Sequence, residues 1–288
     1  MKDEYVMGID NGGTVTKAAI YDRKGQVLAI ASKSTQMLTP REFHTERSID
    51  ELWAANVEVI KKAIEQSGID ASQIKGVAVT GHGNGLYLVD EEGHPVRNGI
   101  ISTDSRAKEY VERWQRSPEF LTDILPKTMQ SIWAGQPVAL LAWLKDFEPE
   151  TLQKARYIFM VKDLIRFYLT GEAFLELTDI SGTNLINVRD CKYDDELLAW
   201  WGLDELRDKL PPIKRSTECC GKITDDVARL TGLCAGTPVS GGVFDISASS
   251  IASGINSLDK MAIVTGTWSI NEYVTDHPVI DKDLFMTS

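Results

Sequence analysis

The feature that most constrains the fold of this 288-residue chain is a unit of strand, glycine turn and strand that begins twice. The first unit predicts a strand over residues 5–10, a turn at 11–13 and a return strand over 16–21. The pattern restarts at Gly236, where a strand leads to a turn at 240–242. Such a repeat favours an α/β protein built from two similar domains.

Between the two units, the spacing of apolar residues predicts helices in alternation with strands. A helix over 48–67 has Ser48 and Asp50 as candidate N-caps. Two strands, over 173–177 and 184–188, are expected to form a hairpin. The other main predicted elements are a strand over 74–80 and helices over 106–115, 137–147, 162–169 and 194–201.

The second unit is far shorter than the first, and its tail over 277–288 shows no helix or strand pattern. The total length suggests about two domains. We therefore expect residues 1–235 to form an N-terminal domain. Residues 236–288 are expected to open a C-terminal domain that is truncated.

The first glycine turn carries the most informative motif, DNGGT at residues 10–14. Its glycines permit positive φ and let the backbone approach a polyanion, and its N–H groups and hydroxyl can donate to phosphate oxygens. The carboxylate at the strand end can hold hydrated Mg²⁺. The plain alternative is an Asn-Gly hairpin with an incidental aspartate. The candidate phosphate-binding residues are Asp10, Gly12, Gly13, Thr14 and Lys17.

A second carboxylate, Asp245, stands beside Phe244 at the head of a predicted helix over 245–253. It can simply cap that helix, because aspartate bonds the free N–H groups of a first turn. The same amides keep a carboxylate ionised and ready to accept a proton. In phosphoryl transfer the base orients a hydroxyl and takes its proton late, so we expect an aspartate of near-normal pKa to suffice.

The next predicted strand, over 260–265, ends in a second turn that suits anions. It contains Thr265, Gly266 and Thr267, whose hydroxyls and N–H groups surround a glycine. A plain turn at a strand end is the alternative. Two such turns facing one another across a cleft can hold one polyphosphate.

Three other segments suit a polyol. The loop GHGNG at 81–85 follows a strand, but a dinucleotide fingerprint would need a third glycine at Leu86. Its open amides can bind sugar hydroxyls, or the loop is merely flexible. Asp104 and Arg106 can fork onto neighbouring hydroxyls, or they form a helix cap and a surface ion pair. Trp133 lies in a predicted loop and can pack against a sugar face.

Charge and composition limit the classes of molecule that this chain is expected to bind. The chain has 31 Lys and Arg against 42 Asp and Glu, a net charge of −11, and this field repels nucleic acids and anionic membranes. No signal peptide or membrane-spanning run is visible, and the four cysteines include no C-x-x-C pair. We expect a cytoplasmic protein without nucleic-acid or membrane partners. The oligomeric state stays open, with a homodimer as one option.

Taken together, these segments resemble the FGGY carbohydrate kinases of the actin/hexokinase-type ATPase superfamily. The stretches that match are GIDNGGTVTKAAIYD, GHGNG, ISTDSRA, VKDLIRFYLTGE, DISGTNLIN, AGTPVSGGVFDISA and TGTWS. The stretches SIWAGQPVALLAWLKDFEPE and LPPIKRSTECCGKIT are most similar to the L-xylulose, or ketopentose, kinase branch.

The resemblance implies two RNase H-like domains, each with a mixed sheet flanked by helices, with ATP and sugar in the cleft between them. It makes Asp245 the catalytic base, residues 10–17 the first phosphate and Mg²⁺ motif, and residues 265–267 the second. Family members are much longer, so it also implies that the adenine pocket lies outside this chain. We expect the chain alone to bind sugar weakly and to have little kinase activity.

The function we predict is ATP- and Mg²⁺-dependent phosphorylation of a small ketose, such as L-xylulose, with Asp245 as base. A non-catalytic sugar- or ATP-binding module is the alternative, and an ATPase without a sugar acceptor is a third option. Related xylulose kinases carry a Met-His pair where this chain has Gly83 and Asn84, so the sugar is left open. The candidate sugar-binding residues are Gly83, Asn84, Asp104, Arg106, Trp133 and Phe244.

Overall fold

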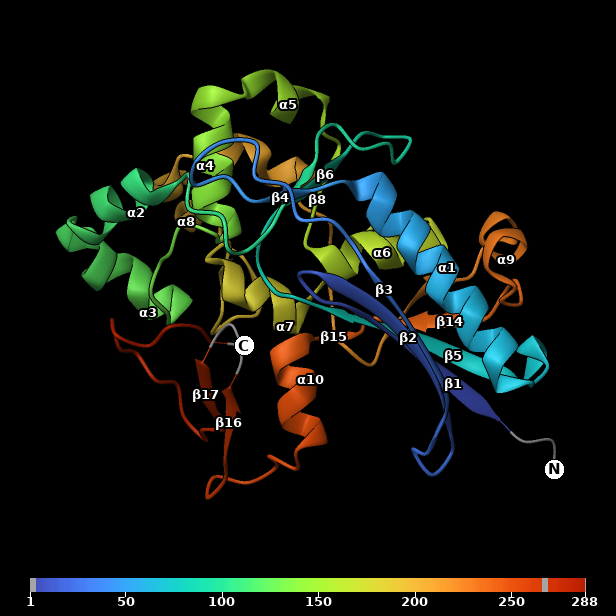
Figure 1. Ribbon diagram of the computed structural model, residues 1–288. Helices are drawn as coiled ribbons and strands as arrows, with labels where there is room; N and C mark the ends of the chain where they lie inside the picture. Colours follow the sequence, from blue (N-terminus) through green and yellow to red (C-terminus); the bar gives the residue numbers. More distant parts are fainter. Residues whose placement is uncertain (1–3, 266–268, 288) are drawn as a thin grey trace.

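A seven-stranded mixed sheet forms the centre of the computed structural model, which describes residues 4–265 and 269–287 (Figure 1). Its strands are β1 (Tyr5–Asn11), β2 (Val15–Asp22), β3 (Val27–Ser34), β5 (Ile74–Gly81), β13 (Cys219–Lys222), β14 (Pro238–Ser240) and β15 (Val243–Phe244). The order is β13-β14-β5-β1-β2-β3, and β15 also pairs with β5. β1, β14 and β15 run parallel to β5. β2 is antiparallel to β1, and β3 is antiparallel to β2, so β3 has the same direction as β1.

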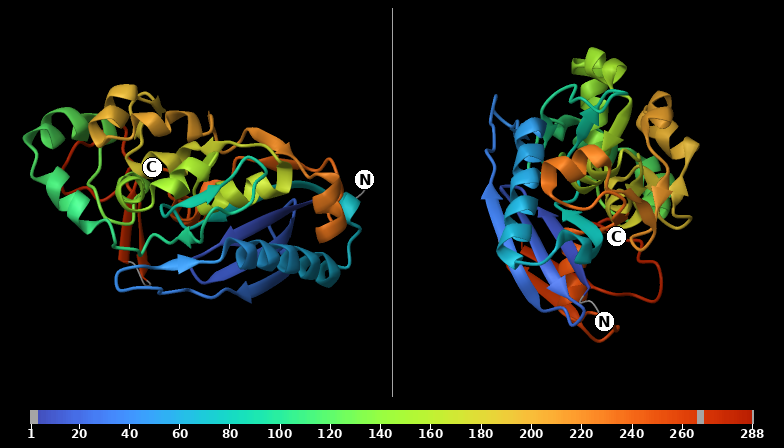
Figure 2. Two further views of the ribbon diagram at one scale, coloured as in Figure 1. Left: turned by 90° about the horizontal axis from the view of Figure 1, so that it is seen from above. Right: turned by 90° about the vertical axis from the view of Figure 1, so that its right-hand side faces the viewer.

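Helices α1 (Ile49–Ser67) and α6 (Val161–Thr170) cover one face of this sheet. Alternate residues of β1, such as Met7 and Ile9, are buried against them, while Val6 on the other face is 50% exposed. Figure 2 shows α1 running alongside the strands. The predicted helix start is confirmed, because the Ser48 side chain accepts a hydrogen bond from the Glu51 N–H.

Between β5 and β13 the chain forms a layer of mainly short helices and strands. Its helices α2, α3, α4, α5 and α8 gather on one side of the molecule, away from α9 (Figure 1). The predicted helix over 137–147 is confirmed as α4. The elements of this layer are β6 (Tyr87–Val89), β7 (Gly99–Ile100), α2 (Lys108–Gln115), α3 (Leu125–Thr128), α4 (Pro137–Phe147), α5 (Pro149–Lys154), β8 (Tyr157–Phe159) and α8 (Asp195–Trp201). The strand β4 (Glu46–Arg47) and the helix α9 (Asp225–Thr231) lie elsewhere in the chain. The chain also has 3₁₀ turns at Ala71–Gln73, Ser181–Thr183 and Asp204–Lys209 and a π-helical turn at Phe120–Ile124.

The predicted hairpin of 173–177 with 184–188 is wrong. β9 (Leu175–Glu176) pairs in parallel with β12 (Ile213–Lys214), and β10 (Ile186–Asn187) pairs with β11 (Lys192–Tyr193). The chain leaves β9 into a short helix, α7 (Leu177–Ile180), because the Glu176 side chain accepts from the Thr178 N–H and caps it.

The last part of the described chain leaves the central sheet. Helix α10 (Asp245–Ala252) lies between that sheet and a separate hairpin of β16 (Met261–Thr265) and β17 (Ser269–Tyr273) (Figure 1). The predicted absence of a helix or strand in the tail over 277–288 is confirmed for its described residues, 277–287. β14 and β15 belong to the first sheet, and the division between residues 235 and 236 stays a prediction. No helix in the described part of the chain combines the length and apolarity that a bilayer crossing requires.

Candidate active site

Strand register brings the two predicted aspartates to one edge of the central sheet. Asp10 of β1 is opposite Thr80 of β5, and Thr80 is opposite Val243 of β15. The Thr80 hydroxyl donates to the Val243 carbonyl oxygen at 2.7 Å, which fixes this row. Asp245 follows Val243 by two residues and opens α10. Because all three strands are parallel, their carboxyl ends lie at the same edge.

The turn between β1 and β2 keeps the backbone of residues 12–14 outside the ladder. The Gly12 N–H donates to the Val15 carbonyl at 3.0 Å, and the buried Arg47 donates from Nη1 to the Gly12 carbonyl at 3.0 Å. Neither Gly12 nor Gly13 has a positive φ, so that reason for these glycines is wrong, and close approach of the backbone to a polyanion stays a prediction. They leave the turn without side chains, beside the exposed Thr14.

Asp10 has the donor chemistry and access that hydrated Mg²⁺ needs. Its carboxylate is about one-third exposed, and Lys17 on the paired strand lies 3.3 Å away. The charge of Asp10 also contributes to a raised pKa at Asp245. A divalent cation would offset this concentration of negative charge, so the residues present fit the ion.

Asp245 is half-buried, and its environment differs from the sequence-based expectation. Burial first, and the charge of Asp10 second, raise the pKa of Asp245 to about 7. The expected near-normal pKa is therefore wrong, because these effects outweigh the backbone hydrogen bonds at the helix start. The N-cap of α10 is Phe244, and Asp245 is the first residue of the helix, although its carboxylate does accept from backbone N–H groups of the first turn.

The loop over 81–85 packs directly against the residue before Asp245. A Cβ at Gly83 would overlap the Phe244 ring, which is itself buried, so only glycine fits there. His82 lies next to this contact, and its Nε2 is 2.9 Å from the Tyr87 hydroxyl. Burial, with the nearby Arg47, lowers the pKa of His82 to about 3, so its imidazole is neutral at physiological pH.

A cavity of about 730 Å³ joins Asp245 to most of the predicted sugar residues. The tail closes one side of it: Phe285 stacks on Trp133 with ring centroids 5.4 Å apart, and Asn84 Nδ2 lies 3.5 Å from Met286 Sδ. Five predicted residues line this cavity, namely Gly83, Asn84, Trp133, Phe244 and Asp245.

Asp104 and Arg106 lie elsewhere, in a buried ion-pair cluster. Arg106 donates to Asp104 and to Glu46, at 2.9 and 2.7 Å from Nη2, and its guanidinium lies over the Trp143 ring. Neither Asp104 nor Arg106 lines the cavity. Their predicted contact with sugar stays a prediction, and the alternative of a surface ion pair is wrong because both side chains are buried.

The second predicted anion turn is described only at its start. Thr265 is exposed and ends β16, opposite Ser269 of β17. Gly266 and Thr267 lie outside the described residues. The relation of this turn to Asp10 stays a prediction.

Comparison with known proteins decides the family. The family model for the N-terminal domain of the FGGY family of carbohydrate kinases matches residues 5–252. The chain belongs to this family. Among curated FGGY relatives, a Pasteurella multocida protein named probable L-xylulose kinase is 39% identical over 275 residues, covering 95% of this chain and 56% of the relative. An Escherichia coli protein named L-xylulose/3-keto-L-gulonate kinase is 39% identical, covering 94% and 54%.

Solved structures confirm the FGGY fold. A ligand-bound xylulose kinase from Lactobacillus acidophilus matches with a TM-score of 0.88 at 24% identity, over 96% of this chain and 55% of that one. A gluconate kinase from the same organism also has a TM-score of 0.88, at 23% identity, over 99% and 58%. The predicted actin-like ATPase fold class is thus confirmed. The chain spans about half the length of the curated relatives it matches.

Sequence reasoning missed a set of fully buried charges beneath the site of this FGGY chain, which we call the buried charged cluster. Lys162 lies at its centre, within 3.4 Å of three carboxylates. Helix α6 is buried nearly all round, so charges that look like a solvent-facing side lie in the interior. A signal exists at the start of α6, where Lys162 and Asp163 fall between apolar Val161 and Leu164. The members are Lys162, Asp163, Arg166, Glu176 and Asp179.

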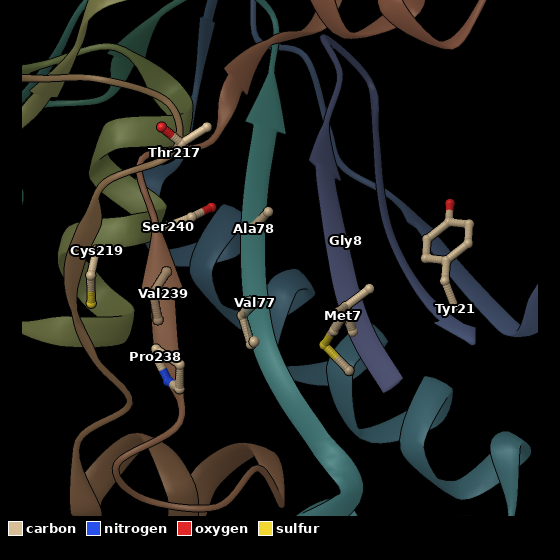
Figure 3. Close-up of a pocket in the computed structure, with 12 residues that line it drawn as sticks. Met7, Gly8, Tyr21, Val77, Ala78, Thr217, Cys219, Pro238, Val239 and Ser240 are labelled. Carbon is tan, nitrogen blue, oxygen red and sulfur yellow. The ribbon is translucent and has the colours of Figure 1, made fainter. Parts of the chain in front are cut away.

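A second cavity, of about 470 Å³, is separate from the site. It lies on the sheet between β1, β5 and β14, and Figure 3 shows its lining, which includes Met7, Val77 and Val239. None of the predicted site residues that the structure describes lines it. Its surface is mainly small and apolar and presents no carboxylate.

Proposed function

We propose that this chain supplies the acceptor side of an ATP-dependent carbohydrate kinase, which transfers a phosphoryl group to a hydroxyl of a small ketose. A ketopentose such as L-xylulose is the proposed acceptor, because the curated relatives at 39% identity carry that name. One observation carries the proposal. Asp245 opens into the cavity that Gly83, Asn84 and Trp133 line, at the same sheet edge as Asp10.

In this proposal Asp245 orients the acceptor hydroxyl and accepts its proton. A base with a pKa near 7 suits this task, because proton transfer is most effective when the pKa is close to the working pH. The aromatic face of Trp133 and the polar loop at Asn84 would hold the sugar in the cavity.

On the nucleotide side, the backbone of residues 12–14 and Lys17 would bind phosphate oxygens. Asp10 would hold Mg²⁺ through water, and the ion supplies neutralisation of the charge on the transferred phosphoryl group. Asp10 and Lys17 are already placed on facing positions of β1 and β2.

The test replaces Asp245 in a completed chain, defined as this chain continued with the part of the Pasteurella multocida relative that lies beyond the match. Asp245→Asn is expected to lower kcat for ketopentose phosphorylation at least about 100-fold, because the proton acceptor is lost. The Kd for the ketopentose, measured by calorimetry, is expected to change little.

Asp225→Asn is the matched control, because Asp225 is also the first residue of a helix but is exposed on α9, far from α10 (Figure 1). It should keep the parental kcat. Turnover retained in Asp245→Asn would remove Asp245 from the role of base. A parent that binds ketopentose and ATP without transfer would instead support the non-catalytic module.

A further inference from the structure

The backbone N–H of Phe244, the residue before Asp245, donates to a side-chain hydroxyl. The Phe244 N–H donates to Thr178 Oγ1 at 3.0 Å, and that hydroxyl donates in turn to Glu176 Oε2 at 2.7 Å. Phe244 is the N-cap of α10, so its N–H fixes where the helix begins. The Thr178 hydroxyl therefore connects a buried carboxylate to the first turn that carries Asp245.

Both carboxylate oxygens of Glu176 have further partners. Its Oε1 accepts from the Thr178 N–H at 3.0 Å and from the Ser216 hydroxyl at 2.7 Å. Lys162 Nζ lies 3.3 Å from Oε2, and both side chains are fully buried. A carboxylate with this many partners has one available position, and Thr178 transmits that position to Phe244.

The buried charged cluster also holds the other end of the same segment. Arg166 Nη1 donates to the Gly241 carbonyl at 2.8 Å and contacts Asp163 Oδ1 at 2.7 Å. Asp163 is paired with Lys162 at 2.9 Å, so one cluster anchors the backbone at both Gly241 and Phe244. The four residues 241–244 connect β14 to the proposed base.

Burying such a cluster is costly, and an apolar core of the same volume would often be as stable. We therefore propose that the cluster serves the site and that Thr178 is a positioning residue for Asp245, acting through the Phe244 N–H. This inference rests on the proposed function, since it assumes that Asp245 is the base. A displacement of about 1 Å at a reacting group can cost about 100-fold in rate.

The test compares Thr178→Val with Thr178→Ser in the completed chain. Valine keeps the shape but loses the hydroxyl, so kcat is expected to fall about 10-fold or more while KM for the ketopentose changes less than about 2-fold. Serine keeps the hydroxyl and is expected to restore most of the parental kcat.

Thr224→Val is the matched control for a general loss of stability. The Thr224 hydroxyl accepts from the Val227 N–H and caps α9, far from the site (Figure 1). It removes a comparable hydrogen bond but should keep the parental kcat. Should Thr178→Val not fold, Thr178→Ala gives the same comparison.

Amide hydrogen exchange at Phe244, measured in the 288-residue chain, tests the same link without turnover. Exchange is expected to become at least about 10-fold faster in Thr178→Val and to stay near the parental rate in Thr178→Ser. Parental kcat, or unchanged exchange at Phe244, in Thr178→Val would overturn the inference. A parent without phosphoryl transfer would refute the proposed function alone, and the exchange result would still decide the role of Thr178.

Discussion

At the scale of single residues, the site places a carboxylate where its charge is costly. Asp245 is half-buried close to Asp10, and both effects favour its protonated form. An aspartate whose pKa is higher in the folded than in the unfolded chain binds its proton more tightly when folded. The free energy of unfolding therefore falls as the pH rises from about 4 to about 7, and this contribution is constant above that range.

Replacing Asp245 by asparagine should remove this penalty. We predict that Asp245→Asn and the parent have similar stability near pH 4, and that the variant is more stable by about 1 to 4 kcal/mol at pH 8. Urea unfolding of the 288-residue chain at both pH values measures the difference. Equal stability of the two proteins at pH 8 would show that the ionised Asp245 carboxylate does not destabilise the folded chain.

Residue chemistry also marks the limit of what the sequence predicted. Asp10 and Asp245 are recognisable because Asp10 lies at the end of a strand before a glycine turn and Asp245 lies just beyond another, and the structure places both at one edge of the central sheet. Thr178 and Glu176 are not recognisable, because their importance comes from a contact with Phe244, 66 residues beyond Thr178 in sequence. Local patterns do not report such distant pairings.

At the scale of elements, the connection from β14 to α10 depends on backbone conformations that only glycine adopts easily. Gly242 has a φ of 81°, and a Cβ there would overlap the Val79 carbonyl oxygen of β5. Gly236 has a similar φ of 83°, but a Cβ there would meet no atom within 4 Å. The two glycines thus separate strain in φ from steric overlap.

Gly242→Ala should therefore be much more harmful than Gly236→Ala. We predict a loss of about 2 kcal/mol or more for Gly242→Ala and about 1 kcal/mol for Gly236→Ala, both measured by urea unfolding. The larger loss reflects forced movement of the backbone at β5. Equal losses for the two variants would contradict the tight packing of this connection.

Elements with a long local signal were predictable, and short ones were not. Helix α4 matches its predicted bounds, and Ser48 caps α1 as expected, because apolar spacing and caps are encoded within a few residues. The error at 173–188 arose because Glu176 starts a helix and leaves β9 to pair with β12 instead. A strand of two residues is too short for its sequence pattern to indicate which strand it pairs with.

At the scale of the whole molecule, the described part of the site comprises the acceptor cavity and the first phosphate turn. The cavity is lined by the loop at 82–84, Trp133, the start of α10, β17 and the tail, while Asp10 and its turn lie at the sheet edge that leads to Asp245. The curated relatives are about twice as long as this chain. Residues that those relatives use for ATP need not all lie within it.

We therefore predict that the 288-residue chain alone shows little or no ATP-dependent phosphorylation of ketopentoses, whereas the completed chain transfers phosphate. A coupled assay for ADP release, run with and without sugar, measures both proteins. Turnover by the 288-residue chain close to that of the completed chain would show that the described residues suffice. ADP release without sugar would instead indicate an ATPase.

The buried charged cluster has a consequence for how the molecule responds to heat. Hydration of charged groups becomes less favourable as temperature rises, so the cost of keeping Lys162 and its carboxylate partners dry shrinks on warming. Apolar contacts gain no comparable advantage over the same range. The contacts that hold residues 241–244 at the start of α10 should therefore weaken less than the neighbouring apolar contacts as the protein approaches thermal unfolding.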